Sequence, residues 1–260
     1  MLVLLPPSEG KASASRGRTL DLCGLSFPEL TATRHAVLDS LVHVCRSQPA
    51  DAVRRLGLSP GLVGEVARNA DLETAATLPV ARLYTGVLYD ALDLASLDAP
   101  ARRRATRNLV VVSALFGALR LGDRVPRYRL AMNADLPGIG PLAAAWREPL
   151  SRVLPAGIGR GLLVDLRSST YAAAWVPPPA LAERTVAVRV LREHAGRRTV
   201  VSHMAKHTRG ELARELVQAP TAPRTPAELA ELAGARWTAE LTAPARAGRV
   251  WALDLVINEG

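Results

Sequence analysis

Lysine is almost absent from this chain. Of its 33 basic residues, only Lys11 and Lys206 are lysines, and all the others are arginines. Cysteine is equally scarce, since Cys23 and Cys45 are the only two, which is too few for the disulfide framework of a small secreted fold. Aromatic residues make up only 4% of the chain. No apolar run approaches the roughly 18–20 residues that span a bilayer, so the sequence predicts no membrane-spanning helix.

The chain also lacks the features of a disordered or exported protein. Apolar residues make up 48% of its 260 residues, which is enough to build a buried core. The opening MLVLL is short and has no basic flank, unlike a signal peptide. We therefore expect a cytoplasmic globular protein with no membrane partner, folded over residues 1–260 as one domain.

Positive charge is in excess, with a formal net charge of +9. Residues 101–130 hold eight arginines against Asp123 alone, and this segment therefore accounts for +7. A GC-rich coding bias that replaces lysine by arginine is one explanation, and a segment that contacts phosphates or an acidic ligand is the other. Under such a bias, a retained lysine marks a position that needs an amine able to lose its proton, unless the two survivors are chance.

Hydrophobic patterns predict a mixed α/β fold. Continuous apolar runs indicate buried strands, and amphipathic segments indicate helices between them. The combination of a hairpin with crossover helices predicts one mixed sheet flanked by helices, of the α/β or α+β class. The predicted strands are MLVLLPP, NLVVVSALFG, GLLVDL, RTVAVRVLRE, RTVVSHM and RVWALDLVI. The predicted helices are Pro28–Arg46, two short ones within Ala50–Arg68, one after Gly86, one from near Pro141, HTRGELARELV and TPAELAELAG with Thr225 as N-cap.

Polar groups follow four of these strands, and a fifth group lies in a turn. Each has an ordinary structural explanation, such as a turn cap, a local ion pair or a satisfied core histidine. Because strand ends of one sheet meet at an edge, we expect the groups to converge on one cleft. They comprise Ser8, Glu9 and Lys11; Ser113, Arg120, Asp123, Tyr128 and Arg129; Asp165, Arg167, Ser168, Ser169 and Tyr171; Ser202, His203, Lys206, His207 and Arg209; and Tyr84, Thr85 and Gly86.

Established cofactor and metal motifs are missing from the sequence. It contains no P-loop, no strand followed by GxGxxG, no HExxH and no pair of CxxC motifs. His203 and His207 have the i, i+4 spacing of two metal ligands on a helix, but His203 falls in a predicted strand. We therefore predict no metal and no cofactor.

The segment LPGIGPLAA resembles the hairpin of a helix-hairpin-helix element, with Gly138 and Gly140 at the turn. The backbone N–H groups of such a turn and of the following helix hold a DNA phosphate, and Arg124 and Arg127 lie nearby in the sequence. The preceding RVPRYRLAMNAD is not a good helix, so half of the motif is missing. LGLSPGLVGEV is a second candidate with better flanking helices.

Five segments together resemble the YaaA family. SEGK after the first strand, YTG, SALFGALRLGDRVPRYRL, VDLRSSTY and VVSHMAKHTRG occur in that family's order and spacing. The sequence is similar in particular to the high-GC branch of that family, through PPSEGK, SFPELT, YTGVLYDALD and LPGIGPLAAAW. The resemblance implies a cytoplasmic protein linked to peroxide stress, with a mixed α/β fold, a basic cleft and DNA binding. A few relatives resemble transferases that move an amide- or hydroxylamine-type nitrogen onto a carboxylic acid.

The chain departs from that family pattern at two places. Ala131–Ala134 replace a Gly/Ser-rich step, and HMAKHTRG stands where text closer to HFNKATKG is usual. Both changes fall in suspected site segments, which favours a specialised paralogue with an altered ligand.

Two functions follow as expectations. In the first, a basic cleft binds double-stranded DNA, and the nucleic-acid-binding residues are Arg124, Arg127, Gly138 and Gly140. In the second, an enzyme acts on a small carboxylate or amide: Arg120, Arg129 or Arg167 holds the carboxylate, and Lys11 or Lys206 is base, nucleophile or oxyanion partner. The catalytic candidates are Lys11, Lys206, Ser8, Glu9, Ser168, Tyr171 and His203. The substrate-binding candidates are Tyr84, Thr85, Ser113, Arg120, Asp123, Tyr128, Arg129, Asn133, Asp165, Arg167, His207 and Arg209. A third function, iron or haem handling, finds no suitable ligand set.

Overall fold

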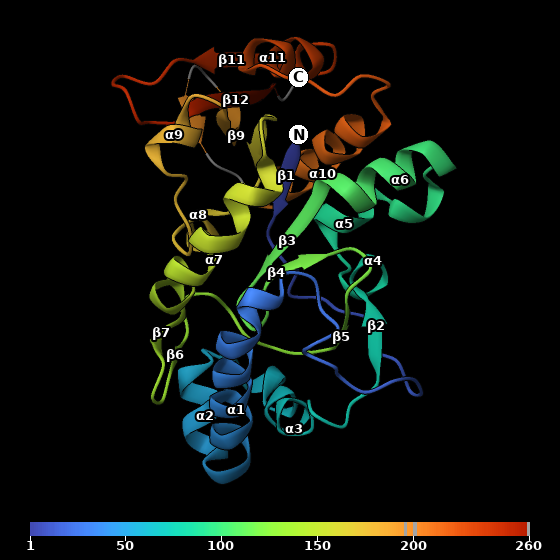
Figure 1. Ribbon diagram of the computed structural model, residues 1–260, viewed down its shortest axis with the longest axis vertical. Coiled ribbons are helices and arrows are strands. Elements are labelled where there is room, and N and C mark those ends of the chain that lie inside the picture. The colour runs from blue at the N-terminus through green and yellow to red at the C-terminus, as the bar shows by residue number, and fades with distance from the viewer. Residues whose placement is uncertain (195–196, 200–201, 259–260) are drawn as a thin grey trace.

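An eight-stranded mixed sheet organises the protein. The computed structural model describes residues 1–194, 197–199 and 202–258 (Figure 1). The five central strands are parallel, and antiparallel strands lie at both edges. In spatial order the strands are β11 (Thr238–Thr242), β12 (Trp251–Asn258), β9 (Thr185–His194), β8 (Leu163–Asp165), β1 (Leu2–Leu5), β3 (Leu109–Ser113) and β4 (Gly117–Arg120), with β10 (Arg197–Thr199) paired to β9.

The centre of this sheet is the most apolar part of the chain. β1 lies between β3 and β8, and every residue of these three strands is buried. Parallel strands covered on both faces read as continuous apolar runs, which is why the sequence identified them without alternation. The carboxyl ends of β1 and β3 therefore lie side by side, and the loops that follow them begin at the same edge.

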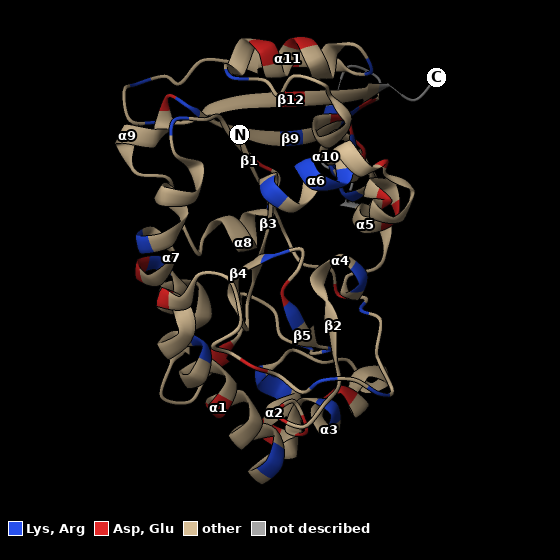
Figure 2. Cartoon of the chain, turned by 45° about the vertical axis from the view of Figure 1, so that its right-hand side comes forward, with Lys and Arg blue, Asp and Glu red and all other residues tan. Residues whose placement is uncertain are grey.

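Helices cover both faces of the sheet. Figures 1 and 2 show one group of helices on one side and a second group on the other. The first group is α5 (Val87–Leu92), α6 (Ala99–Asn108) and α10 (Ser202–Gln218). The second is α7 (Leu142–Ile158), α8 (Ser169–Ala172) and α9 (Pro179–Ala182). α11 (Pro226–Gly234) packs against β11 and β12.

A smaller layer lies beyond the carboxyl ends of β1 and β3 (Figure 1). It positions the loops that emerge from the sheet. It consists of α1 (Thr31–Ser47), α2 (Pro49–Arg55), α3 (Gly64–Ala70), the pair β2 (Thr77–Pro79) and β5 (Arg124–Pro126), α4 (Val80–Leu83), and the short hairpin β6 (Asp135–Leu136) and β7 (Gly140–Pro141). Two 3₁₀ turns, Pro28–Leu30 and Pro60–Leu62, belong to this layer, and a third, Leu94–Ser96, connects α5 to α6.

The mixed α/β fold and most elements are confirmed. Thr225 caps α11, since its hydroxyl accepts a hydrogen bond from the Glu228 N–H at 3.1 Å. The prediction of a strand through His203 was wrong: β10 ends at Thr199 and α10 begins at Ser202. The edge strands β4 and β11 were not predicted. β4 is short and directly follows the apolar run of β3, whereas β11 is partly exposed and carries a weak apolar signal.

The turn between β3 and β4 requires a glycine. Gly117 has φ +65°, and a Cβ there would lie 2.6 Å from the indole ring of the buried Trp146. The Trp146 Nε1–H donates to the Ala114 carbonyl at 2.7 Å, so the indole fixes the turn as well as filling the core. Ser113 sits at the start of this turn and is held at the carboxyl end of β3.

The basic segment 101–130 does not form one surface. Figure 2 shows its basic residues on α6 and, apart from these, near β5. Arg104 donates to the Val217 and Gln218 carbonyls and so satisfies the carboxyl end of α10. Arg102 and Arg103 are exposed on α6. The arginines of this segment on α6 and those near β5 therefore lie in separate places.

Across the described ranges no helix is both long and apolar enough to cross a membrane.

Candidate active site around Lys11

Two of the sequence motifs meet through backbone pairing. Lys11 of SEGK forms an antiparallel β-bridge with Tyr84 of YTG, and the Thr85 N–H donates to the Gly10 carbonyl at 3.2 Å. The bridge fixes the backbone of both turns at the carboxyl end of β1. It places the Lys11 side chain directly among residues from distant parts of the chain.

The Lys11 ammonium group is buried against aromatic rings. The residue is only 7% exposed, and its Nζ donates to the Ser8 carbonyl at 2.7 Å. Nζ also lies 4.4 Å from the Tyr128 ring centroid and 5.5 Å from that of Tyr84. Both rings stabilise the charged form, but they cannot replace the water that burial removes.

Burial lowers the pKa of Lys11 from its ordinary value of 10.5 to about 7. The positive charges of Arg129 and Arg127 lower this pKa further, while Glu65 and Glu9 raise it. A substantial fraction of the Lys11 side chain is therefore a neutral amine near pH 7. A neutral amine can accept a proton or attack an electrophilic carbon, which a protonated lysine cannot do.

All four tyrosines of the chain interact around this amine. Tyr128 Oη lies 2.7 Å from Ser113 Oγ and 2.9 Å from Tyr84 Oη. The rings of Tyr84 and Tyr89 stack with centroids 5.3 Å apart. Burial raises the pKa of each, that of Tyr171 to about 12. Near pH 7 these phenols are neutral and serve as hydrogen-bond donors, not as bases.

Ser113 fixes the direction of the first hydrogen bond in this hydroxyl chain. Ser113 Oγ accepts the Leu115 and Phe116 N–H groups at 3.1 and 3.0 Å, which occupies both of its lone pairs. Its own proton is therefore donated to Tyr128 Oη. The next hydrogen bond joins the hydroxyls of Tyr128 and Tyr84, and either one can donate. When Tyr128 donates, the Tyr84 proton is left for a further acceptor.

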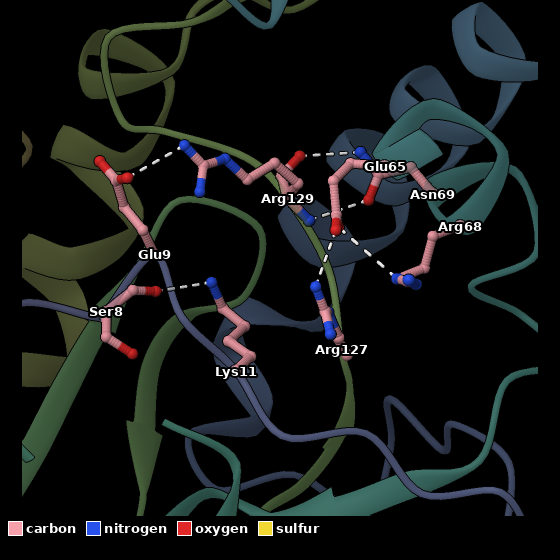
Figure 3. Close-up of polar contacts among 8 residues, drawn as sticks. All are labelled: Ser8, Glu9, Lys11, Glu65, Arg68, Asn69, Arg127 and Arg129. Atoms are coloured by element: carbon pink, nitrogen blue, oxygen red, sulfur yellow. Dashed lines mark hydrogen bonds and ion pairs between the residues drawn. The ribbon is translucent and has the colours of Figure 1, made fainter. Parts of the chain in front are cut away.

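An ion pair forms the rim of the site (Figure 3). The Arg129 guanidinium lies 3.1 Å from a carboxylate oxygen of Glu9, whose side chain is 78% exposed, while that of Arg129 is 23% exposed. The backbone of Arg129 is held at both its N–H and its carbonyl by the amide of Asn69, at 2.9 and 2.7 Å. The backbone of Arg129 is thus fixed, but among the described residues only the exposed carboxylate of Glu9 pairs with its guanidinium.

A second ion pair lies deeper on the same side. Glu65 Oε1 accepts from Arg127 at 2.7 Å, and Glu65 Oε2 lies 3.6 Å from Arg68 (Figure 3). Glu65 and Glu9 are the two carboxylates that act on Lys11, and each is already engaged by arginine.

Comparison with known proteins accounts for these motifs. The family described as peroxide stress protein YaaA matches residues 1–241. The chain belongs to the YaaA family. It is 54% identical over 260 residues to UPF0246 protein SCO2297 of Streptomyces coelicolor, covering 100% of this chain and 99% of that relative. It is 40% identical over 262 residues to UPF0246 protein CE1889 of Corynebacterium efficiens, covering 99% and 100%. The description of this family links its members to peroxide stress.

In this YaaA-family chain the end of β8 is a structural cluster. The Arg167 guanidinium donates to both carboxylate oxygens of Asp165 at 2.8 and 2.7 Å, and also to the carbonyls of Tyr171 and Trp175. The Arg167 side chain is 0% exposed, so its donors are used within the fold. Ser168 follows as the N-cap position of α8 but makes no side-chain cap bond.

Arg120 and Asp123 lie away from the Lys11 centre. β4 runs back along β3, so Arg120 pairs with Val110 near the start of that strand. Arg120 donates to the Arg107 carbonyl at 2.6 Å. The Asp123 carboxylate accepts from the backbone and hydroxyl of Ser26 and from the Arg120 N–H, so it shapes a loop.

The first turns of α10 carry the other lysine. His203, Lys206 and His207 are exposed, and His207 Nδ1 lies 3.3 Å from Glu211 on the same helix. Arg209 points back toward the sheet, where burial lowers its pKa and Asp165 opposes that shift. No group of three potential metal ligands occurs in the described part of the chain.

α10 nevertheless passes close to the element that follows YTG. A Cβ on Gly210 would lie 2.1 Å from the Leu88 carbonyl, so only glycine permits this approach of α10 to α5. The tight packing places the segment with Lys206 beside α5, but no contact joins Lys206 to the Lys11 centre within the described ranges.

The candidate DNA-contacting turns are only partly as expected. Gly138 and Gly140 have φ +71° and +77° and form the β6–β7 hairpin before α7. The element directly before this hairpin in the described structure is the strand β5, not a helix, so the hairpin is not part of a helix-hairpin-helix element. Asn133 is exposed just before it, and Arg124 donates to the Thr77 carbonyl at 2.9 Å.

Three residues of the site were not predicted. Glu65 and Asn69 lie on α3, where a polar helix residue gives no local sign of a distant partner. Tyr89 also escaped attention, although its rarity was a usable signal: it is one of only four tyrosines, and its hydroxyl donates to the Pro6 carbonyl at 2.7 Å.

Proposed function

We propose that this YaaA-family protein is an enzyme that acts on a small carboxylic acid or its amide at the Lys11 centre. The observation that carries the proposal is the buried Lys11 amine, whose pKa of about 7 gives it proton-accepting capacity at neutral pH.

Arg129 is the arginine that suits the substrate's carboxylate. Of the three candidates, Arg167 is saturated by Asp165 and two carbonyls. Arg120 lies at the opposite end of β3, where its Cζ is 5.3 Å from the centroid of the Phe27 ring. Only Arg129 offers its guanidinium to an exposed carboxylate next to Lys11, and a guanidinium binds a carboxylate through two parallel hydrogen bonds.

The reaction class is transfer of an acyl group between nitrogen nucleophiles. A hydroxylamine-type nitrogen attacks the carbon of a substrate carboxamide, Lys11 takes a proton from the attacking nitrogen, and the original nitrogen leaves as ammonia with a proton returned to it. The Tyr84 hydroxyl, at the end of the hydroxyl chain, supports the negative charge that develops on the acyl oxygen.

The test is hydroxamate formation from hydroxylamine and monoamides of small dicarboxylic acids, which present one carboxylate and one carboxamide. The wild-type protein should release hydroxamate and ammonia in equal amounts. Lys11→Met should lower the rate by about 10²-fold or more, the usual contribution of a general base. Lys206→Met is the matched control, and equal loss in both variants would overturn the assignment to Lys11.

DNA binding is a second candidate, favoured by arginines without acidic partners. The Thr77 hydroxyl donates to the Arg18 carbonyl, and the Arg124 guanidinium donates to the Thr77 carbonyl. Both arginines are exposed. Arg82 is exposed nearby on α4, and none of the three forms an ion pair within the described residues. Duplex DNA affinity that falls steeply between low and physiological salt, and that weakens in the triple glutamine variant, would support this function. Affinity independent of salt would exclude it.

A further inference from the structure

The Lys11 amine is buried without a counterion. Its two nearby acids are held by arginines, Glu9 by Arg129 and Glu65 by Arg127. Lys11 itself makes one hydrogen bond, to the neutral Ser8 carbonyl, and no ion pair within the described structure. A lysine that only needed to anchor the turn would gain from a carboxylate partner, and none is provided.

The geometry above the amine matches a ligand with a carboxylate. Figure 3 shows Lys11 below the ion pair of Glu9 and Arg129, with the Lys11 amine directed toward Ser8 and the Arg129 guanidinium toward Glu9. Glu9 and Gly10 are exposed, so Glu9 can leave Arg129 without disturbing the core. A ligand carboxylate then takes the place of the Glu9 carboxylate.

A proton donor is also in place. In the arrangement in which Tyr128 donates to Tyr84, the Tyr84 hydroxyl proton is left to be donated onward. The Tyr84 ring lies beside Lys11, with its centroid 5.5 Å from Nζ. A hydroxyl donor next to an amine is what dehydration of an amine–carbonyl adduct requires.

We propose that Lys11 reversibly forms an imine with the carbonyl carbon of a small 2-oxo or aldehydic acid whose carboxylate is bound by Arg129. The Nζ lone pair forms a bond to the carbonyl carbon, and one Nζ proton moves to the former carbonyl oxygen. The resulting hydroxyl receives a proton and leaves as water, while the second Nζ proton is released and the C=N bond forms. No oxidant or reductant is consumed.

This inference rests on the same Lys11–Arg129 centre as the proposed function, but not on nitrogen transfer. Hydroxamate formation requires an acyl substrate, whereas imine formation requires only the neutral amine and a carbonyl. The two can therefore fail separately.

Because the chain has only two lysines, the site of amine labelling can be assigned directly. The full chain is incubated at pH 7 with glyoxylate and cyanoborohydride, which reduces an imine to a stable secondary amine, and peptides are analysed by mass spectrometry. Lys11, Lys206 and the amino terminus are the only aliphatic amines of the chain. Lys11 should gain one carboxymethyl group about tenfold faster than Lys206, with a rate that saturates as glyoxylate increases.

Variants separate specific binding from simple reactivity. Arg129→Gln should slow glyoxylate labelling of Lys11 by about tenfold, and much more than it slows labelling by neutral acetaldehyde. Glu9→Gln should accelerate glyoxylate labelling, because the internal carboxylate no longer competes for Arg129. Lys206→Arg is the control and should leave Lys11 labelling unchanged.

Two outcomes would overturn the inference. The first is glyoxylate labelling of Lys11 that is no faster than that of Lys206 and does not saturate. The second is equal slowing of glyoxylate and acetaldehyde labelling in Arg129→Gln. If hydroxamate formation is absent but saturable labelling of Lys11 remains, the nitrogen-transfer function is excluded and imine formation is supported. If hydroxamate forms but Lys11 is not labelled specifically, only imine formation is excluded.

Discussion

Two neighbouring strand ends of the same sheet hold a buried cation in opposite ways. After β8, the Arg167 guanidinium is enclosed with two carboxylate oxygens and two carbonyls. After β1, the Lys11 amine is enclosed with aromatic rings and one carbonyl. Both clusters look alike in the sequence, as polar residues following an apolar run. A complete set of partners indicates a structural role, whereas a buried charge without a counterion keeps the ability to react.

The largest loss of stability is expected from breaking the β8 cluster. Arg167→Met leaves the Asp165 carboxylate buried without its partner and removes bonds to Tyr171 and Trp175. We expect a loss of about 3–5 kcal/mol in the free energy of unfolding, measured by urea denaturation.

The double variant Asp165→Leu with Arg167→Met is the control for that prediction. It removes both charges together and should recover most of the lost stability, because no unpaired charge remains. If the free energy of unfolding of Arg167→Met falls by less than about 1 kcal/mol, the β8 cluster does not have a structural role.

The β1 cluster should respond with the opposite sign. The folded-state pKa of Lys11, about 7, lies below its ordinary value of 10.5. Between these values the unfolded chain holds a proton that the folded chain lacks, so this residue makes stability rise with pH across that window. Below about pH 7 both states are protonated, and the full cost of burying the charge remains.

Lys11→Met removes that cost. Between pH 10.5 and pH 6 the stability of the variant relative to the wild type should rise by about 5 kcal/mol, and most of this rise should occur above pH 7. Urea denaturation across this pH range measures the difference, in which all other titrating groups cancel. Lys206→Met, on the exposed face of α10, should show a pH-independent difference within about 0.5 kcal/mol. Identical pH profiles for both variants would contradict the buried-amine assignment.

The smallest effect should come from interrupting the tyrosine chain. Tyr128→Phe removes the hydroxyl that hydrogen-bonds both Ser113 and Tyr84, so these two buried hydroxyls lose a partner. The free energy of unfolding should fall by about 1–3 kcal/mol. The substitution should also slow glyoxylate labelling of Lys11, because the Tyr84 hydroxyl loses its partner. Tyr89→Phe is the matched control, since its hydroxyl donates to the Pro6 carbonyl outside this chain; an equal slowing in both would exclude a directional role.

Much of the fold could be predicted because its central strands are buried on both faces. Their apolar runs need no context to be recognised, and β1, β3 and β8 were all identified. The edge strands β4 and β11, and the helical start of the segment with His203, depend on what packs beside them. Local pattern and propensity decide such segments poorly, because tertiary contacts outweigh them.

The candidate site likewise contains residues that the sequence indicated and residues that only tertiary contacts reveal. Lysine scarcity, the SEGK and YTG motifs and the tyrosines were visible in the sequence, and so was membership of the YaaA family. Glu65 and Asn69 were not visible, because an acid and an amide on a polar helix become meaningful only when β5 and the loop after it lie alongside.

The sequence by itself determined which chemical groups are rare in this protein: two lysines, four tyrosines and an excess of arginine. Only the tertiary structure decided that one lysine is enclosed by the tyrosines while the other faces solvent. The physical reason is that the reactivity of an amine depends on its solvation and on the charges around it. Both are set by residues far apart in the chain, brought together by the Lys11–Tyr84 bridge at the end of β1.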